Sequence, residues 1–272
     1  MKKETITSAQ NPKFKELLAL QEKSRLRREK ALFVVEGKRE LERCLDAGYS
    51  ARTFFFCPDI CPEEEVLRIA GKTGTQDIQF IEIPPFLYEK AAYRGGTEGI
   101  IAEIRMQEKS LGDIRLGRNP LVVILESVEK PGNLGAVLRS ADAAGADAVI
   151  VCDPLTDLTN PNLIRASTGA VFTTQTVAAG SEETISWLKA NDIRILTAQL
   201  QDSSLYYDTD MTCGTAIVMG TESTGLTGIW RQNADRHIRI PMLGKLDSLN
   251  VSVSAAILLY EAVRQRKMKD NE

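Results

Sequence analysis

Four continuous apolar runs in the carboxy-terminal half of the chain predict the strands of a parallel sheet. Each run is followed by loop and helix signals, and the runs span residues 121–125, 148–151, 194–196 and 215–219. Runs that are apolar at nearly every position fit strands covered by helices on both faces of a sheet. Because ligands of such sheets gather at the carboxyl ends of the strands, we expect a site in the loops that follow these runs.

Residues 240–261 form the most distinctive stretch. A short apolar strand ends at Pro241, a glycine-containing loop follows, and Ser248-Leu249-Asn250 opens a run that predicts a buried helix. Its first turns alternate apolar residues with Ser248, Asn250, Ser252 and Ser254. Buried polar groups cost a few kcal/mol unless they are hydrogen-bonded. Two interpretations stay open: helix capping with close packing of small residues, or a ligand pocket at a strand-to-helix junction.

The amino-terminal part alternates strand and helix signals and predicts a small α/β sandwich. A helix start is expected at Asn11-Pro12. Strands are expected at residues 32–35, 53–56, 79–83 and 99–104, with helices at 37–46, 62–70 and 84–93. Residues 106–120 carry charges and glycines with little apolar periodicity, which is typical of a linker. The predicted organisation is a domain of residues 1–108, a linker of residues 109–120 and a domain of residues 121–272.

A basic cluster follows the first predicted helix. It consists of Lys23, Arg25, Arg27, Arg28 and Lys30, opposed only by Glu22 and Glu29. One interpretation is a solvated helix face, and the other is a set of contacts to RNA phosphates, which require lysine or arginine at this density.

Composition narrows the class of protein. The 272 residues carry a formal net charge of -3, which argues against nucleic-acid binding through the whole surface but allows a local basic patch. The five cysteines show no spacing that supports a disulfide framework or a zinc site. Because the chain also lacks a signal-peptide segment and an uncharged run of membrane-spanning length, we expect a cytoplasmic protein.

The loop after the first apolar run contains a candidate site. Pro131 and Gly132 predict a turn, Asn133 is expected to cap a helix, and Gly145 is expected to end it. Arg139 lies six residues after Asn133, nearly two helical turns, so both side chains could face one site. Considered alone, Arg139 could equally be an ordinary surface residue.

The loop at residues 220–227 resembles a dinucleotide-binding turn only superficially. Glu222 stands where the second glycine of that turn would be, and an acid there would repel phosphate. The single histidine, His237, allows neither a hydrolytic triad nor a metal site. What remains is a reaction in which positioning matters more than a strong base or a Lewis acid.

Together, three motifs resemble those of the SpoU (TrmH-like) family of RNA ribose 2'-O-methyltransferases in the SPOUT superfamily. In chain order they are Asn133-Leu134-Gly135-Ala136 with Arg139, Gly220-Thr221-Glu222 with Gly225-Leu226, and Ile240-Pro241-Met242 with Ser248-Leu249-Asn250-Val251. The amino-terminal part resembles the family's small L30e-like substrate-binding domain, through Ser8-Ala9-Gln10-Asn11-Pro12 and Phe33-Val34-Val35-Glu36-Gly37.

The resemblance implies S-adenosylmethionine as methyl donor, no metal, a deep trefoil knot in the carboxy-terminal domain, and a homodimer whose active site uses both subunits. Such a knot would be an exception to the usual avoidance of threaded chains. The expected cofactor-binding residues are Leu196, Thr197, Ala198, Gly220, Ile240 and Leu249. The expected catalytic residues are Arg139, Asn133, Glu222, Ser248 and Asn250.

The implied reaction is direct displacement, in which a ribose 2'-oxygen attacks the sulfonium methyl group. The family's proposed base is the arginine, here Arg139, yet a guanidinium is effectively always protonated. We therefore expect Arg139 to stabilise the developing oxyanion or to hold a phosphate. Ribosomal RNA of the 23S type is the expected substrate, bound in part by residues 23–30. The alternatives are transfer RNA, a non-catalytic RNA-binding or ribosome assembly factor, and a nucleotide-dependent oxidoreductase, which Glu222 disfavours.

Overall fold

The computed structural model describes residues 2–74, 77–93, 98–221 and 224–269. Two compact units divide the chain, one made of Met1–Glu108 with Asp157–Thr173 and the other of Lys109–Thr156 with Thr174–Glu272. The sequence-based boundaries had assigned residues 157–173 to the second domain. This segment packs in the first unit because its two short helices, α7 (Pro161–Ala166) and α8 (Ala170–Thr173), contact strand β2 and helix α3 there.

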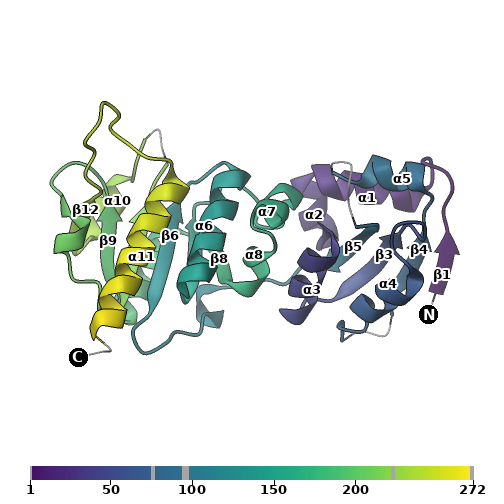
Figure 1. The fold of residues 1–272 in the computed structure, drawn as a ribbon, viewed down its shortest axis with the longest axis horizontal. Helices are drawn as coiled ribbons and strands as arrows, with labels where there is room; N and C mark the ends of the chain where they lie inside the picture. The colour runs from purple at the N-terminus through teal and green to yellow at the C-terminus, as the bar shows by residue number, and fades with distance from the viewer. Residues whose placement is uncertain (1, 75–76, 94–97, 222–223, 270–272) are drawn as a thin grey trace. The chain divides into compact units, whose positions relative to one another are not determined.

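The first unit is a mixed five-stranded sheet with helices, as the alternating pattern predicted (Figure 1). Its order is β1-β4-β3-β5-β2, in which β5 runs antiparallel to β3 and β2 while the other pairs are parallel. The strands are β1 (Lys2–Thr5), β2 (Leu32–Glu36), β3 (Ala51–Phe56), β4 (Gln79–Glu82) and β5 (Ile100–Arg105). The helices are α1 (Pro12–Glu22), α2 (Ser24–Lys30), α3 (Lys38–Asp46), α4 (Glu63–Ala70) and α5 (Pro85–Ala91).

Helix α1 begins where the Asn11-Pro12 pair predicts. The Asn11 side chain accepts a hydrogen bond from the Lys13 backbone amide at 2.9 Å, and Pro12 occupies the first helical position. Phe14, Leu17 and Leu20 then face inward at helical spacing and are fully buried in the core of the first unit.

The second unit contains a seven-stranded sheet in which every pair is parallel, confirming the interpretation of the apolar runs. Its order is β10-β12-β9-β11-β6-β7-β8. The strands are β6 (Leu121–Glu126), β7 (Ala148–Cys152), β8 (Gln175–Ala179), β9 (Arg194–Ala198), β10 (Ser204–Leu205), β11 (Thr215–Met219) and β12 (Arg236–Arg239). The helices are α6 (Pro131–Ala144), α9 (Ser181–Ala190), α10 (Gly228–Asn233) and α11 (Val251–Lys269), with short 3-10 turns at Leu111–Asp113 and Tyr206–Asp208.

The segment expected to be a linker is packed rather than extended. Leu111 and Ile114 are buried in the same apolar cluster as Val122 and Ile150 of the sheet. Residues 109–114 therefore belong to the body of the second unit.

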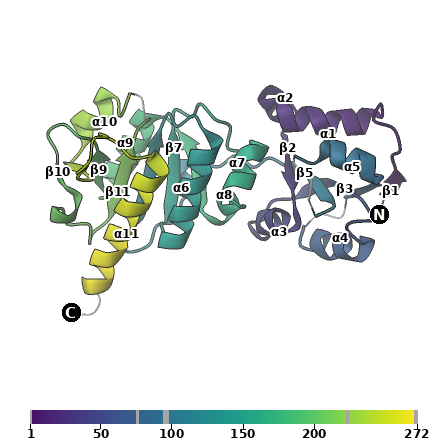
Figure 2. The same cartoon turned by 45° about the horizontal axis from the view of Figure 1, so that its top comes forward.

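Helices cover both faces of this sheet. Helices α6 and α11 lie side by side on one face, while α9 and α10 lie on the other (Figures 1 and 2). Helix α11, which was predicted to be a buried helix, is buried on one side only. Ala255, Leu258 and Leu259 are buried, whereas Val253 and Tyr260 are about half exposed, because the sheet and α6 cover only one side of the helix.

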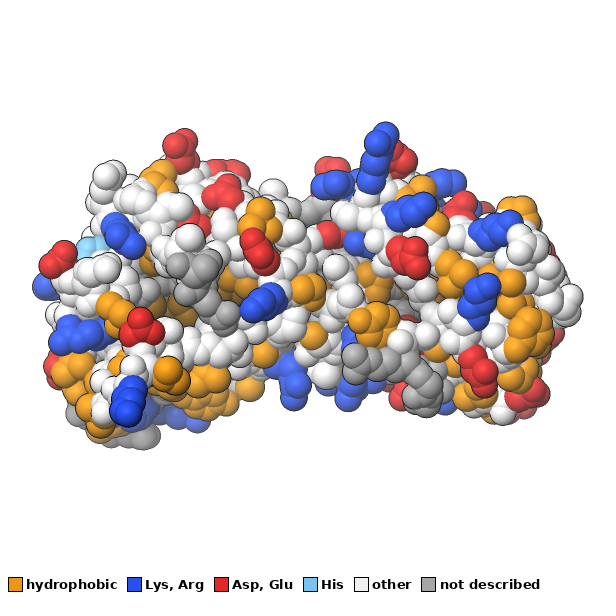
Figure 3. Space-filling view, turned by 90° about the horizontal axis from the view of Figure 1, so that it is seen from above, with side chains coloured by type: hydrophobic (Ala, Val, Ile, Leu, Met, Phe, Trp, Pro, Cys, Tyr) orange, Lys and Arg blue, Asp and Glu red, His pale blue; other side chains and the backbone are white. Residues whose placement is uncertain are grey.

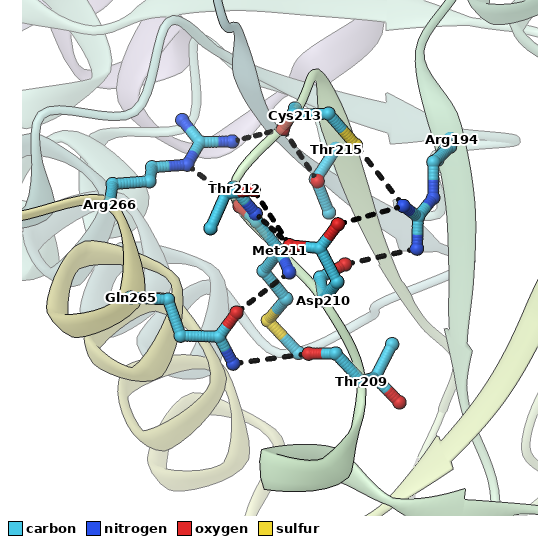
Figure 4. A network of polar contacts seen from close by, with 9 residues as sticks. All are labelled: Arg194, Thr209, Asp210, Met211, Thr212, Cys213, Thr215, Gln265 and Arg266. Carbon is cyan, nitrogen blue, oxygen red and sulfur yellow. Dashed lines mark hydrogen bonds and ion pairs between the residues drawn. The ribbon is translucent and has the colours of Figure 1, made fainter. Parts of the chain in front are cut away.

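The carboxy-terminal half of α11 is attached to the sheet by the Arg266 guanidinium (Figure 4). Its nitrogens donate to the backbone carbonyls of Asn119 at 2.7 Å, Cys213 at 2.8 Å, Met211 at 3.0 Å and Pro120 at 3.1 Å. Its neighbour Gln265 accepts from the Met211 amide at 2.8 Å. These contacts join α11 to the segments that lead into β6 and β11.

Candidate active site

A cavity of about 360 Å³ opens at the carboxyl ends of β9, β11 and β12 in the second unit. Its lining comes from residues 198–201 at and after the end of β9, from the end of β11 and the loop that follows, from Arg231 of α10, and from residues between 238 and 254. The cavity has the size of a small-molecule site and lies at the sheet edge where the strand pattern predicts one.

Most of the expected cofactor-binding residues line this cavity. They are Ala198, Gly220, Ile240 and Leu249, together with Ser248 from the expected catalytic set. Leu196 and Thr197 do not, because both are fully buried within β9. The Thr197 hydroxyl lies 2.6 Å from Nδ1 of His237 on the neighbouring strand, so the single histidine is engaged in the sheet.

The loop after β11 is closed so tightly that only glycine fits at position 220. A Cβ atom there would lie 2.3 Å from the backbone carbon and oxygen of Gly225. The Gly225 amide donates to the Thr221 carbonyl at 3.0 Å, and Gly225 itself adopts a φ of 67°. The two glycines therefore allow a backbone turn that forms one wall of the cavity. The expected catalytic residue Glu222 lies outside the described residues.

Asn133 and Asn250, both expected in the site, are in contact. The Asn250 amide nitrogen donates to Asn133 Oδ1 at 3.1 Å. Asn250 Oδ1 also accepts from the Ser252 backbone amide at 3.0 Å and thereby caps α11. The predicted capping role of Asn133 is wrong, because Pro131 takes the first position of α6 and Lys130 precedes it. Asn133 instead faces the start of α11.

Arg139 is exposed on α6. Within the part of the chain that the structure describes, it has no hydrogen-bond or ion-pair partner. Ser248 is also exposed, and its hydroxyl donates to Asp247 at 3.3 Å. Asn133, Ser248, Asn250 and the cavity thus form one region. Arg139 lies on the helix that carries Asn133, and its cation is unpaired among the described residues.

Glu126 is a structural residue of the site that the sequence analysis missed. It ends β6 and is 3% exposed, and its carboxylate accepts from the Thr227 amide at 2.8 Å and from the Thr227 hydroxyl at 2.6 Å. These bonds hold the end of the loop that contains Gly220 and Gly225. The sequence feature that could have pointed to Glu126 is its position directly after the apolar run of residues 121–125.

The basic segment of the first unit divides into exposed and buried members. Lys23 and Arg28 are exposed, whereas Arg25 pairs with Glu29 at 2.7 Å. Lys30 pairs with Glu16 at 3.0 Å. On the face drawn in Figure 3, basic side chains stand among acidic ones rather than forming an unbroken positive surface.

Arg27 departs from the expected RNA-binding set because it is 2% exposed. Its guanidinium pairs with Asp157 at 2.8 Å and donates to the Leu20 carbonyl at 2.8 Å. A phosphate contact by Arg27 would require breaking this buried pair, so the side chain supports the fold.

The described residues contain neither a cluster of metal ligands nor a membrane-spanning helix. Nowhere in them do three or more His, Cys, Asp or Glu side chains gather as a metal-ion site would require. Likewise, none of their helices combines the length and the apolar character needed to cross a membrane.

Comparison with known families covers both units. A model of the SpoU rRNA Methylase family matches residues 120–260, and a model of the MRM3-like substrate binding domain matches residues 11–102. The first match contains all three motifs, and the second contains the basic segment and the Phe33-Val34-Val35-Glu36-Gly37 motif.

Similar proteins align with nearly the whole chain. The 23S rRNA (uridine(2479)-2'-O)-methyltransferase of Streptomyces viridochromogenes is 30% identical over 268 residues, covering 96% of this chain and 92% of the relative. The 23S rRNA (guanosine(2553)-2'-O)-methyltransferase RlmP of Bacillus subtilis is 28% identical, covering 94% of this chain and 97% of the relative.

Solved structures show the same fold. A crystal structure of an RNA 2'-O ribose methyltransferase has a TM-score of 0.82 at 40% identity, covering 97% of this chain and 99% of that chain. The AdoMet-bound rRNA methyltransferase from Sinorhizobium meliloti has a TM-score of 0.88 at 29% identity, covering 96% of this chain and 98% of that chain.

Proposed function

The chain belongs to the SpoU rRNA Methylase family, and we propose that it transfers a methyl group from S-adenosylmethionine to a ribose 2'-hydroxyl of 23S-type ribosomal RNA. The observation that carries this proposal is the cavity at the carboxyl ends of β9, β11 and β12, which is lined by residues of the second and third motifs. The hydrogen bond from Asn250 to Asn133 joins the third motif to the first. Transfer RNA is less favoured, because the similar proteins that span the whole chain act on 23S rRNA.

The lining of the cavity fits S-adenosylmethionine. Leu226, Ile240 and Leu249 offer an apolar surface for the adenine ring, and the tight turn at Gly220 exposes backbone groups to polar parts of the cofactor. The Asp247 carboxylate also faces the cavity and suits the cofactor's cationic amino group. When bound, the cofactor supplies an electrophilic methyl group, so the protein needs to position the ribose rather than to activate a metal-bound nucleophile.

Arg139, Asn133 and Asn250 act on the RNA side in this proposal. As the 2'-oxygen forms its bond to the methyl carbon, the bond between that carbon and the cofactor's sulfur breaks, and its electron pair stays on sulfur. The 2'-hydroxyl proton passes to water, and the Arg139 guanidinium would stabilise the negative charge that develops on the 2'-oxygen. Asn250, fixed by its bonds to Asn133 and Ser252, holds the start of α11 in place against the cavity. Arg139 is suited to this task because no described group neutralises its charge.

The homodimer and the trefoil knot are also part of the proposal. Leu243 is 98% exposed and Leu246 is 75% exposed in the loop before α11, and Tyr260 is half exposed on the helix itself. Large apolar side chains that are exposed in this way support the packing of a second copy against this part of the chain. The contact of α11 with both α6 and the segment before β11 is compatible with a threaded carboxy-terminal segment.

The test is transfer of tritium from labelled S-adenosylmethionine to total cellular RNA, followed by sizing and digestion of the labelled RNA. We expect label in one large ribosomal species, at a 2'-O-methylated nucleotide that resists alkaline cleavage. Arg139→Ala should abolish the label and leave cofactor affinity unchanged, and Arg139→Lys should retain only a small part of the activity, because lysine lacks the planar guanidinium. Label in transfer RNA would redirect the substrate assignment. Cofactor binding without label on naked or ribosome-assembled RNA would favour a non-catalytic RNA-binding factor.

A further inference from the structure

The first unit contains a second, larger cavity that the methyl-transfer site does not use. Its volume is about 540 Å³, and its walls come from α1, β2, the end of α5 and the helix α7. All of these elements belong to the first unit. The volume falls in the range of small-ligand sites, and Leu18, Val34 and Ile164 give the cavity an apolar floor.

Arg165 lies over the ring of Tyr93 at this cavity, and the two side chains together make what we call the Tyr93–Arg165 surface. The guanidinium carbon of Arg165 lies 4.8 Å from the centre of the Tyr93 ring, and the tyrosine is 51% exposed. Both side chains line the cavity. Exposed tyrosine rings and arginine planes are the surfaces on which unstacked bases of RNA bind, because every base has a π-face.

Glu36 is a partly buried acid beside this surface. It belongs to the Phe33-Val34-Val35-Glu36-Gly37 motif, which has no role in the proposed methyl-transfer site. Its side chain is 13% exposed and also lines the cavity. The carboxylate accepts from the Tyr93 backbone amide at 3.1 Å and from Arg165 at 3.4 Å. A carboxylate has about four acceptor positions, so these two bonds leave acceptor capacity on Glu36.

The electrostatics of Glu36 favour an additional hydrogen-bond donor. Burial raises the pKa of Glu36, although the Tyr93 amide and the Arg165 charge act in the opposite direction. A ligand N–H group aimed at the carboxylate would replace the water that burial removes and would stabilise the charged form. Lys90, which is exposed at the rim, supplies a cation for a phosphate of the same ligand.

We propose that this cavity binds one unstacked guanine of the RNA substrate, with its ring on the Tyr93–Arg165 surface and its Watson–Crick edge on Glu36. The proposal rests on the RNA substrate of the proposed function. It names a second contact point on that RNA, apart from the ribose that is methylated.

Guanine is the base that matches an acceptor-only side chain. Its Watson–Crick edge carries two adjacent donors, the N1–H and the N2 amino group, which can meet both oxygens of a carboxylate. Adenine and cytosine place an acceptor nitrogen beside their amino donor, and uracil flanks its one N–H with two carbonyls. Each of these would set a lone pair against Glu36, which weakens binding when the site is desolvated.

The test measures binding of 5'-GMP, AMP, CMP and UMP to the full-length chain by NMR saturation transfer, with the cofactor site filled by saturating S-adenosylhomocysteine. We expect GMP to bind most tightly to the unmodified protein. Tyr93→Ala should weaken GMP binding at least fivefold, Tyr93→Phe should retain it, and Glu36→Gln should remove the preference for GMP over AMP. Phe86→Ala is the matched control, because Phe86 is 58% exposed on α5 but does not line the cavity.

A second measurement connects the cavity to the RNA. In the methyl-transfer assay, Tyr93→Ala should raise the KM for RNA at least fivefold while kcat and cofactor affinity stay within twofold, since the residue contacts neither the cofactor nor the methylated ribose. Equal binding of all four nucleotides, or GMP binding that Tyr93→Ala leaves unchanged, would overturn the proposal even if the enzyme methylates RNA. If the protein bound GMP selectively but transferred no methyl group, the guanine-binding role of the cavity would stand and the proposed function would be wrong.

Discussion

The Asn250 side-chain amide donates to Asn133 Oδ1 at 3.1 Å, which joins the start of α11 to the first turn of α6 across 117 positions of sequence. The other end of the same amide caps α11 through the Ser252 backbone amide. One side chain therefore fixes two elements of the site, and the two functions can be separated by substitution.

Asn250→Ala should remove both bonds, whereas Asn250→Ser should keep a capping oxygen but be too short to reach Asn133. Loss of a helix cap costs about 1 kcal/mol of stability, so urea unfolding should show that loss for the alanine variant and little for the serine variant. Both variants should lose methyl transfer, because both lose the contact with Asn133. Full activity in Asn250→Ser would show that the contact with Asn133 has no part in catalysis.

Gly220→Ala should reduce cofactor affinity at least tenfold, which corresponds to about 1.4 kcal/mol. The added Cβ would lie 2.3 Å from the Gly225 backbone, so the loop must open, and this loop lines the cavity. Calorimetric titration with S-adenosylmethionine measures the effect. Gly244→Ala is the control, because no atom lies within 4 Å of a Cβ at that position. Unchanged affinity for S-adenosylmethionine in Gly220→Ala would mean that this loop does not contact the cofactor.

The parallel sheet could be predicted because its central strands are apolar at nearly every position. Strand β8 escaped prediction because Gln175 and Thr176 interrupt the pattern, and the Gln175 side chain serves the structure by donating to the carbonyls of Asp147 and Arg115. Strand β1 reads Lys-Lys-Glu-Thr and lies at the edge of its sheet, where side chains need not be apolar. Hydrophobic patterning reveals strands only where the core covers them.

The assignment of residues 157–173 to the first unit could not be predicted from local sequence. Helices α7 and α8 have six and four residues, too short for a periodic signal. The segment is held by contacts with residues far away in the sequence. One example is the pair of Arg27 and Asp157, which are 130 positions apart. In the site, motif resemblance singled out Gly220, Ile240 and Leu249, which line the cavity, while the position of Asn133 depended on a partner 117 positions away.

Arg27→Met should destabilise the protein by about 3 kcal/mol near neutral pH, because it leaves the partly buried Asp157 without its cation. Arg25→Met is the control, since Arg25 is largely exposed and pairs only with its helical neighbour Glu29. Equal stability of the two variants would contradict the structural role of Arg27.

The Arg27–Asp157 pair should also give a defined pH dependence. Burial raises the pKa of Asp157, but hydrogen bonds from Thr159 and the charge of Arg27 outweigh it, and the pKa is lowered below the ordinary 3.8. The stabilisation is therefore complete above pH 3.8 and is lost as the pH falls through the lower folded-state pKa. The stability difference between wild type and Arg27→Met should be constant near neutral pH and narrow below about pH 4. Urea unfolding at a series of pH values measures this difference in unfolding free energy. If the difference narrowed only above pH 6, a titrating group other than Asp157 would be responsible for it.

Replacing Lys23 and Arg28 together by alanine should weaken RNA binding and flatten its salt dependence. Each lost phosphate contact lowers the slope of log K against log salt by about 0.7 for single-stranded RNA, so the double variant should lose about 1.4. Cofactor affinity should not change, because the cavity proposed to bind the cofactor belongs to the second unit. Lys15→Ala is the control, as Lys15 is exposed on α1 outside the basic segment. Parallel loss of RNA and cofactor binding would show that the segment supports the fold instead.

Arg266→Ala should destabilise the second unit by about 3 kcal/mol, because it leaves four backbone carbonyls without the donors of a partly buried guanidinium. Figure 4 shows two of these carbonyls, those of Met211 and Cys213. Arg266→Lys should recover part of this loss, since an ammonium group can reach some of the four acceptors but lacks the fork that spans them. Arg264→Ala is the matched control two positions earlier on α11, where the side chain is exposed and pairs with Glu261 on the same helix. Because the carboxy-terminal half of α11 is anchored here while its first turn faces the cavity, Arg266→Ala should also weaken cofactor binding, and amide hydrogen exchange should show faster opening along α11. If Arg266→Ala kept wild-type stability and showed rapid hydrogen exchange only in the last turn of α11, Arg266 would hold only the end of the helix.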